Sequence, residues 1–205
     1  MTPLEGLKVL DFTSLLPGPL ATLVLAEAGA DVTKVERPGM GDDMRTYVPK
    51  FGVDAVNFAL LNRGKRSVQI DLKAADARAR MHALVERADV LIEQFRPGVM
   101  ERLGLGPEAA HAINPRVIYC SISGYGQRGP LSDRAGHDLN YVAETGLLGL
   151  SRGADGEPVL PPALVADIGG GSYPAVINIL LALIERERTG RGARLDIAMT
   201  DNVFT

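Results

Sequence analysis

Two segments of the sequence place an acid–base side chain beside glycines at the expected start of a helix. His137 lies between Gly136 and Asp138, where free backbone N–H groups could hold a ligand oxygen. A helix N-terminus also disfavours the imidazolium, which keeps His137 available as a base near neutral pH. Asp167 precedes three consecutive glycines, 169–171, where a ligand can approach the backbone closely. Taken alone, neither residue establishes catalysis, and a helix N-cap explains Asp167 on its own.

Other catalytic chemistries find little support in the residues. The histidines His82, His111 and His137 and the single cysteine, Cys120, have no metal-ligand spacing, so no metal site is expected. No G-x-S-x-G nucleophile elbow is present. We expect Cys120, in an apolar run, to be a buried structural thiol. We expect His82 and His111 to be solvated surface side chains.

The elements that must carry these residues alternate in the α/β manner. Strands are expected at 7–12, 30–36, 67–72, 90–92, 117–123 and 194–199. Helices are expected at about 20–28 after a Pro/Gly loop at 17–19, and at 56–61, 77–88, 139–148 and 170–188, with a last one from Val203 to Thr205 capped by 200–202. This order predicts a Rossmann-like, mostly parallel sheet flanked by helices. The first strand–helix–strand unit lacks G-x-G-x-x-G, so no dinucleotide site is expected.

Composition narrows the class of protein further. The chain has 205 residues, 22 Lys+Arg against 25 Asp+Glu, a formal net charge of −3 and 46% hydrophobic residues. These values are typical of a soluble globular protein and lack the basic footprint of a nucleic-acid binder. The most apolar segment, 175–184, is shorter than the roughly 20 residues that a bilayer span needs, so we expect a core helix there. No secretory signal is visible, and a cytoplasmic location without a membrane or nucleic-acid partner is expected.

Several separated motifs occur in a fixed order along the chain. They are LEGLKVLD at 4–11, GADV at 29–32, VERPG at 35–39, GKRS at 64–67, FRPG at 95–98, NPR at 114–116 and TGRG at 189–192. With them the chain resembles the class III CoA-transferase family, also called the CaiB/BaiF family, over all its residues. Within that family the segment AGHDLNY at 135–141 is similar to the α-methylacyl-CoA racemase branch, because the transferases typically carry a tyrosine where His137 stands.

The resemblance implies a fold and an assembly. Residues 1–205 would form the N-terminal part of a CoA-binding large domain with a Rossmann-like, mostly parallel sheet. The family's small domain and C-terminal return segment are not covered, nor is the acidic residue that supports the catalytic histidine in the racemases. An interlocked homodimer is implied for the full-length protein.

The resemblance also implies an activity. That activity is racemisation of 2-methylacyl-CoA thioesters by 1,1-proton transfer through an enolate, with His137 and Asp167 as the two bases. Coenzyme A is then part of the acyl-CoA substrate, and no separate cofactor or metal is expected. Two alternatives stay open: CoA transfer between carboxylic acids with Asp167 as nucleophile, and an inactive CoA-binding fragment.

A set of CoA contacts follows from the resemblance as well. Arg37 would lie next to the nucleotide, where a guanidinium suits a phosphate or stacks on adenine. The other implied contacts are Gln69, Ile70, Asp71, Leu72, Gln94, Phe95 and Arg102 and, toward the thioester, Gly136, Asp138, Leu139, Asn140 and Tyr141.

Overall fold

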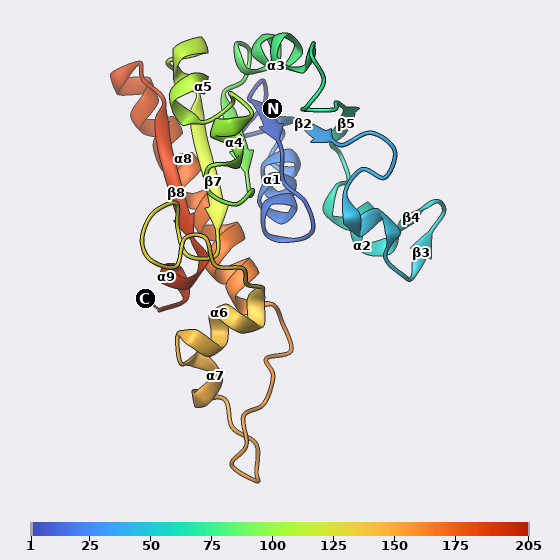
Figure 1. Ribbon diagram of the computed structural model, residues 1–205, viewed down its shortest axis with the longest axis vertical. Coiled ribbons are helices and arrows are strands. Elements are labelled where there is room, and N and C mark those ends of the chain that lie inside the picture. Colours follow the sequence, from blue (N-terminus) through green and yellow to red (C-terminus); the bar gives the residue numbers. More distant parts are fainter. Residues whose placement is uncertain (1, 205) are drawn as a thin grey trace.

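Six parallel strands form the centre of the molecule. The structure is a computed structural model that describes residues 2–204. The strand order is β5-β2-β1-β6-β7-β8, and every neighbouring pair is parallel (Figure 1). The strands are β1 (Lys8–Asp11), β2 (Asp31–Glu36), β5 (Arg66–Gln69), β6 (Val90–Glu93), β7 (Ile118–Ser123) and β8 (Ala193–Ala198). The expected Rossmann-like parallel sheet is therefore confirmed.

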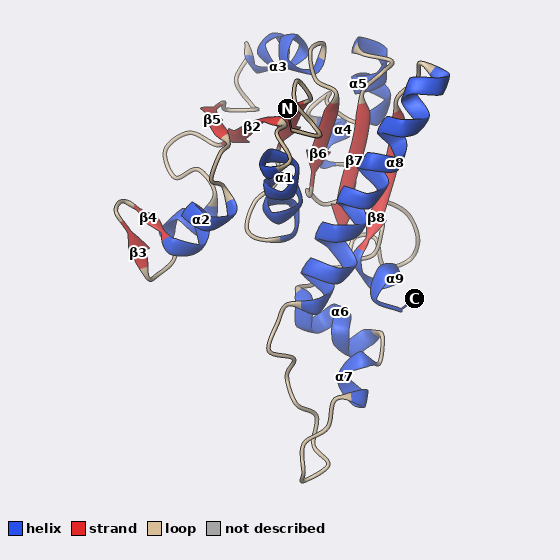
Figure 2. Ribbon diagram, turned by 180° about the vertical axis from the view of Figure 1, so that it is seen from behind, coloured by secondary structure: helices blue, strands red, loops and turns tan. Residues whose placement is uncertain are grey.

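Helices lie on both faces of this sheet and beyond its edges (Figure 1). They are α1 (Pro17–Glu27), α2 (Val56–Leu61), α3 (Ala77–Val85), α4 (Val99–Arg102), α5 (Pro107–Ile113), α6 (Asp138–Glu144), α7 (Leu147–Leu150), α8 (Tyr173–Thr189) and α9 (Met199–Phe204). Helices α1 and α8 pack on one face and α3, α4 and α5 on the other (Figures 1 and 2). A hairpin of β3 (Lys50–Phe51) and β4 (Asp54–Ala55) projects from one side together with α2 (Figure 1).

Alternate side chains of the central strands fill two hydrophobic cores, because successive residues of a strand point to opposite faces. Ile92 and Cys120 enter the core beneath α1 and α8. Their neighbours Leu91 and Tyr119 enter the core beneath α3 and α5. All four side chains are fully buried, and the burial of each large apolar one contributes roughly 1.5–3 kcal/mol. Cys120 is the buried structural thiol that was expected.

Three of the expected helices have different boundaries in the structure. Residues 17–19 form the first turn of α1 and not a loop, because a proline at the first helical positions gives up only an N–H that has no helical partner. The expected helix at 139–148 is two helices, since Gly146 has a left-handed φ of 82° and separates α6 from α7. The expected helix at 170–188 begins earlier, with a π-helical segment (Ala166–Ser172) that runs into α8.

Two boundaries near the ends of strands also differ. Strand β5 stops at Gln69, so residues 70–72 lie beyond the strand. Helix α9 begins at Met199 rather than at Val203, and Thr205 lies outside the described residues. The reason for the early start is tertiary: both the backbone N–H and the hydroxyl of Thr200 donate to the carbonyl oxygen of Gly124, at 3.0 and 2.8 Å. Local sequence patterns contain no trace of that contact.

One helical stretch within residues 2–204, Ala166–Thr189, is long and apolar enough to cross a membrane by length and composition, with a mean hydropathy of 1.4. Its inner side chains, among them Ala175 and Ile179, are buried in the core beside β7 and α1. This packing is that of a core helix. The outer side of α8 exposes Tyr173, Ile177 and Ile184.

The order of the strands identifies where a ligand can bind. From β1 the chain adds β2 and β5 on one side of the sheet, then returns to β6 and adds β7 and β8 on the other. In open parallel sheets, a crevice forms beyond the carboxyl ends of the strands where this direction reverses. The segments at this point are 12–15, after β1, and 94–97, after β6.

Candidate active site

Two pockets open at this reversal point, and Phe95 borders both. The β2 pocket has a volume of about 390 Å³ and is lined by Phe12, Thr13, Ser14, Val35, Glu36, Arg37, Gly41, Asp42, Asp43, Ile70, Asp71, Leu72, Lys73, Phe95, Val99 and Leu103. The α6 pocket, of about 290 Å³, is lined by Leu15, Pro17, Gln94, Phe95, Arg96, Pro97, Ile122, Ser123, Gly124, Ser132, Arg134, Ala135, Gly136, His137, Tyr141, Asp167 and Met199. The site is therefore two adjoining chambers at the carboxyl edge of the sheet.

The α6 pocket brings together His137 and Asp167, which lie 30 positions apart in the sequence. His137 is the N-cap of α6, as expected, and its backbone N–H donates to Oδ1 of Asn140 at 3.0 Å. Asp167 is not an N-cap, because the π-helical segment is capped by Val165 and Asp167 lies in its first turn. Each side chain is thus held at the start of a helical element that faces the pocket.

Tyr141 sets the path of the backbone that leads into His137. Its hydroxyl donates to the carbonyl oxygen of Gly136 at 2.6 Å. A Cβ at Gly136 would lie 2.5 Å from the Tyr141 ring, and one at Gly124 would lie 2.6 Å from the same ring. Since real Cβ atoms do not approach that closely, both positions require glycine. The ring, clamped between β7 and the α6 loop, fixes His137 relative to the sheet.

Asp138 positions the backbone that carries Asp167. The Asp138 side chain is 6% exposed. Its Oδ1 accepts the backbone N–H groups of Ala166 and Asp167 at 2.7 and 2.9 Å. These donors belong to the first turn of a helical element and have no acceptor within it. A carboxylate of α6 therefore anchors the start of the segment that carries Asp167.

The surroundings of Asp167 favour proton transfer near neutral pH. The pKa of its carboxyl is raised to about 6. Burial is the main cause, the nearby Asp138 carboxylate acts in the same direction, and His137 opposes both. A carboxyl with this pKa exchanges protons readily at physiological pH, as a general acid–base group must. Perturbed carboxyls in a cleft are also typical of functional sites.

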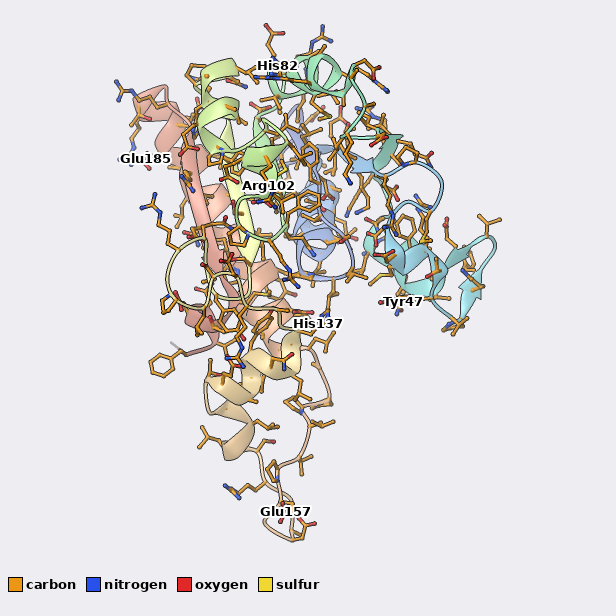
Figure 3. The ribbon with its side chains drawn as sticks, viewed as in Figure 1. Tyr47, His82, Arg102, His137, Glu157 and Glu185 are labelled. Atoms are coloured by element: carbon orange, nitrogen blue, oxygen red, sulfur yellow. The ribbon has the colours of Figure 1, made fainter. Side chains whose placement is uncertain are left out.

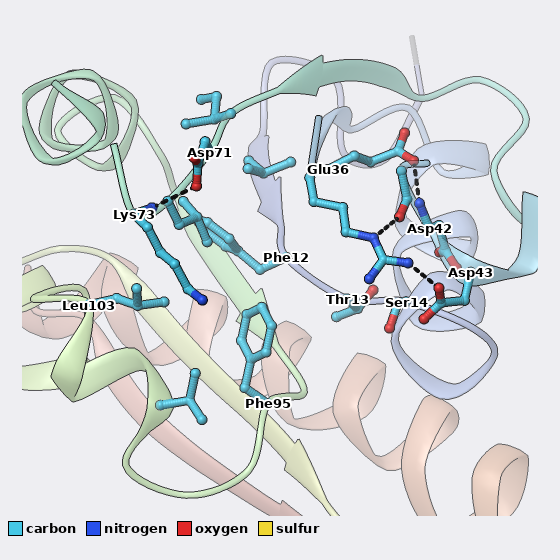
Figure 4. A pocket seen from close by; sticks show the side chains of 16 residues that line it. Phe12, Thr13, Ser14, Glu36, Asp42, Asp43, Asp71, Lys73, Phe95 and Leu103 are labelled. Carbon is cyan, nitrogen blue, oxygen red and sulfur yellow. Dashed lines mark hydrogen bonds and ion pairs between the residues drawn. The ribbon is translucent and has the colours of Figure 1, made fainter. Parts of the chain in front are cut away.

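The β2 pocket combines aromatic and basic groups. Phe12 and Phe95 face its interior, and Lys73 extends across it from the segment after β5 (Figure 4). Within residues 2–204 the Lys73 ammonium makes no hydrogen bond or ion pair. The Arg37 guanidinium donates to the carbonyl oxygen of Gly41 at 3.0 Å and pairs with Asp43. Two cations and two aromatic rings suit a phosphorylated aromatic ligand.

Glu36 and Arg45 support the turn that carries Arg37. Nε and Nη2 of Arg45 donate to the two carboxylate oxygens of Glu36 at 2.8 and 2.7 Å. The hydroxyl of Ser67 and the backbone N–H of Asp42 donate to the same carboxylate. Burial alone would raise the pKa of Glu36, but these donors outweigh it and lower the pKa to about 2. The Glu36 carboxylate, which stays ionised at neutral pH, consequently holds the turn at the end of β2.

The structure places the residues implied by the resemblance in three groups. In the β2 pocket lie Arg37, Ile70, Asp71, Leu72 and Phe95. In the α6 pocket lie Gln94, Phe95, Gly136, His137, Tyr141 and Asp167. Bordering neither pocket are Gln69, Arg102, Asp138, Leu139 and Asn140.

The residues of the third group lie at the edge of the site or outside it. Gln69 supports the Arg37 turn by accepting the backbone N–H of Gly39 at 3.4 Å. Leu139 is exposed. Arg102, on α4, lies in a different part of the molecule from His137 (Figure 3).

Sequence reasoning missed several lining groups. The segment 13–15 borders both chambers, and its position after the first strand was a usable signal once the strand order is known. Lys73 and Arg134 carried no local signal, because single basic residues in loops are common. Arg96 belongs to the FRPG motif but was not identified as a lining residue. Within residues 2–204, no group of three or more His, Cys, Asp or Glu side chains could hold a metal ion. The surface expectation for His111 is also wrong, since its ring is half-buried and contacts the carbonyl oxygen of Val117.

Glu93, beneath the segment 94–97, makes stability depend on pH. Burial raises the pKa of Glu93 to about 7, the Ser121 hydroxyl and the Phe95 N–H oppose this shift, and the Glu101 and Asp196 carboxylates add to it. Because the folded pKa exceeds the unfolded one, the folded chain binds the proton more tightly. The free energy of unfolding should therefore fall by about 1–3 kcal/mol as pH rises from 4.5 to 8.

Glu93→Gln is expected to remove this contribution and flatten the pH dependence. Urea unfolding of both proteins at pH 5 and pH 8 measures it, since all other titrating groups are shared. If the free energy of unfolding changes by the same amount between pH 5 and pH 8 in the two proteins, Glu93 is not protonated in the folded chain.

Comparison with known proteins gives a consistent result. The family model described as CoA-transferase family III matches residues 4–205. An acetyl-CoA:oxalate CoA-transferase of Acetobacter aceti is 44% identical over 203 residues, which cover 98% of this chain and 52% of that protein. The α-methylacyl-CoA racemase of Homo sapiens is 41% identical over 198 residues, 97% of this chain and 48% of the racemase.

A solved structure of a family member has the same fold as this chain. The crystal structure of a CAIB/BAIF family protein from Brucella suis superposes with a TM-score of 0.94 at 41% identity, over 99% of this chain and 55% of that one. The chain spans about half the length of the relatives that it matches.

Proposed function

The chain belongs to CoA-transferase family III, and from this premise we propose that it binds an acyl-CoA across its two pockets. The nucleotide of CoA would occupy the β2 pocket, and the acyl thioester would occupy the α6 pocket. The chain's relatives include both CoA-transferases and racemases, so family membership alone does not choose between the two reactions.

The β2 pocket holds groups that suit the nucleotide of CoA, beside the carboxylates of Glu36, Asp42, Asp43 and Asp71. Arg37 and Lys73 supply two cations for phosphates, and Phe12 and Phe95 supply aromatic surface for adenine. The segment 70–72 provides a further wall. Because Phe95 borders both pockets, the two chambers adjoin, as a ligand that spans both of them requires.

For the reaction we propose racemisation at the carbon α to the thioester carbonyl. One base removes the α-proton to give an enolate, and a second group returns a proton to the opposite face. His137 and Asp167 supply the two groups, each acting as base in one direction and as acid, when protonated, in the other. Backbone N–H groups at the start of α6 are the candidate donors to the enolate oxygen. The observation that carries this proposal is that the two residues share one pocket.

CoA transfer is the second candidate, and the transferases among the relatives favour it. In that reaction the Asp167 carboxylate would attack the thioester carbonyl, release CoA as the thiolate and form a mixed anhydride. The thiolate would then attack the enzyme carbonyl of the anhydride, releasing the first acid and leaving an enzyme–CoA thioester for the second acid. His137, which has a basic nitrogen at the pocket, favours proton transfer instead. A homodimer of the full-length protein and a cytoplasmic location are further proposals from family membership.

A single experiment separates these reactions. The protein is incubated in D₂O with one enantiomer of a 2-methylacyl-CoA and an unrelated free carboxylic acid, and the thioesters are read by mass spectrometry. A one-unit mass gain on the intact thioester with loss of enantiomeric purity supports racemisation. A new CoA ester of the second acid supports transfer. If neither product forms although CoA binds, the chain binds CoA but has no activity of its own. If CoA does not bind, the whole proposal is wrong.

Arg37→Ala is expected to weaken CoA binding about 10- to 100-fold, the usual value of one charge-assisted contact to a phosphate. Isothermal titration of CoA into the protein measures this change. Arg80→Ala is the matched control, because Arg80 is an exposed arginine of α3 that borders neither pocket. Equal affinities of the Arg37 and Arg80 variants would exclude Arg37 from the CoA site.

A further inference from the structure

Four charged side chains are buried beneath the segment 13–15, which we call the switch loop. They are Asp11, Lys34, Asp42 and Lys65, and each side chain is at most 2% exposed. Nζ of Lys34 lies 3.0 Å from Oδ2 of Asp42, and Nζ of Lys65 lies 3.4 Å from Oδ2 of Asp11. Such a concentration of buried charge is costly unless hydrogen bonds satisfy it. The contacts of these groups therefore show what the cluster does.

The cluster holds the backbone of the switch loop at three points. The Lys34 ammonium donates to the carbonyl oxygen of Thr13 at 2.6 Å. Oδ1 of Asp11 accepts the backbone N–H of Thr13 at 2.8 Å. Oδ1 of Asp42 accepts the backbone N–H of Leu15 at 3.1 Å. The Lys34–Asp42 pair thus binds the loop at two backbone groups: Lys34 binds the carbonyl oxygen of Thr13, and Asp42 binds the N–H of Leu15.

The loop needs this support because its conformation is unfavourable. Leu15 has a φ of 59°, the left-handed region, and it is the one non-glycine residue within 2–204 that does. A branched side chain is disfavoured there. Such conformations persist where the surroundings fix them, and they cluster at functional sites.

The loop also lies where the two pockets meet. Thr13 and Ser14 border the β2 pocket, and Leu15 borders the α6 pocket. A shift of the loop would therefore change both chambers together. Figure 4 shows Thr13, Ser14 and Asp42 on the same side of the β2 pocket.

We propose that the buried Lys34–Asp42 pair is a positioning device that holds the switch loop in its left-handed conformation, and that CoA binding depends on the loop being held there. This inference rests on the proposed function of the β2 pocket. Stability alone does not explain an ion pair at this depth, because well-packed apolar residues of similar volume often serve stability equally well. Apolar side chains cannot donate to the carbonyl oxygen of Thr13 or accept the N–H of Leu15, so two of the three holds on the loop need the ion pair.

The double variant Lys34→Met with Asp42→Leu tests this distinction. It removes both charges together, so neither is left unpaired. We expect the variant to fold, to bind CoA about tenfold more weakly or worse, and to show amide hydrogen exchange about tenfold faster in peptides spanning 12–22. Urea unfolding reports folding, titration calorimetry reports CoA affinity, and exchange mass spectrometry reports the loop.

A second ion pair, less deeply buried, lies at the opposite end of the sheet and serves as the control. Arg186 on α8 pairs with Asp89, just before β6, at 3.1 Å, and neither residue borders a pocket. Arg186→Met with Asp89→Leu is expected to leave CoA affinity and exchange at 12–22 within about twofold of the unmodified chain, because additivity holds for distant sites.

A folded Lys34→Met, Asp42→Leu protein with unchanged CoA affinity would overturn the proposal. If that variant does not fold, Asp42→Ala replaces it, because alanine has no acceptor for the Leu15 N–H. A folded Asp42→Ala protein with unchanged affinity and unchanged exchange at 12–22 overturns the proposal equally. If the unmodified chain binds no CoA, it is the proposed function that fails, and exchange at 12–22 alone then decides whether the pair holds the loop.

Discussion

Asp167→Asn is expected to lower the rate of racemisation of a 2-methylacyl-CoA by 10²- to 10⁴-fold, the usual contribution of one general acid–base group. Asparagine has nearly the same shape, and its backbone N–H can still donate to Asp138. It cannot take up a proton, however, whereas the carboxyl it replaces has a pKa raised to about 6. CoA affinity should change by less than about threefold, because Asp167 borders the α6 pocket and not the β2 pocket.

The two-base arrangement makes this prediction sharper. With Asp167 replaced, His137 still faces one side of the α-carbon, so one enantiomer should continue to exchange its α-proton with D₂O without inverting. His137→Gln should show the mirror result and exchange only the other enantiomer. Mass spectrometry of each enantiomer separately measures both outcomes.

The matched control is His82→Gln, since His82 lies on α3 and borders neither pocket. It should retain racemisation and exchange of both enantiomers. If Asp167→Asn also retains racemisation, Asp167 is not one of the two bases. If both active-site variants stop exchange of both enantiomers, a two-base reaction at this pocket is excluded.

Much of the fold could be predicted because its signals are local. The strands 90–92 and 117–123 are short apolar runs bounded by turn residues, and the helix on 77–88 repeats apolar residues at helical spacing. The two strands are buried, and the helix buries the face that carries Ala77, Met81 and Val85. His137 was recognisable because a histidine between a glycine and an aspartate marks a helix start. What joins these pieces is long-range: strand order could not be read from local patterns, and only the family resemblance implied that His137 and Asp167 share a site.

Where the predictions fail, a tertiary contact overrides a local pattern. Asp167 has the residue type and neighbours of an N-cap, yet Asp138 caps the segment from 29 residues away, and Asp167 is released to face the pocket. Lys34 alternates with apolar residues in β2 and gave no reason to expect a buried ammonium. Its burial depends on Asp42 and Thr13, which only the folded chain brings near it.

Asp138 provides the second large effect, because it acts on Asp167 in two separable ways. Its carboxylate accepts the N–H groups of Ala166 and Asp167, and its charge raises the pKa of Asp167. Asp138→Ala removes both actions and leaves two donors of a buried helix start without an acceptor. We expect a loss of about 2–4 kcal/mol in the free energy of unfolding, measured by urea, because each unpaired buried donor costs about 1–3 kcal/mol.

Asp138→Asn separates the two actions, since an amide oxygen still accepts the N–H groups while the charge is lost. Stability should stay within about 1 kcal/mol of the unmodified chain. Loss of the like charge should lower the pKa of Asp167, so the acid limb of the racemisation pH profile should move down by about one pH unit. The sign is fixed: a carboxylate that no longer faces a second negative charge gives up its proton at lower pH. An unmoved acid limb, with stability retained, would show that Asp138 caps the segment without tuning Asp167.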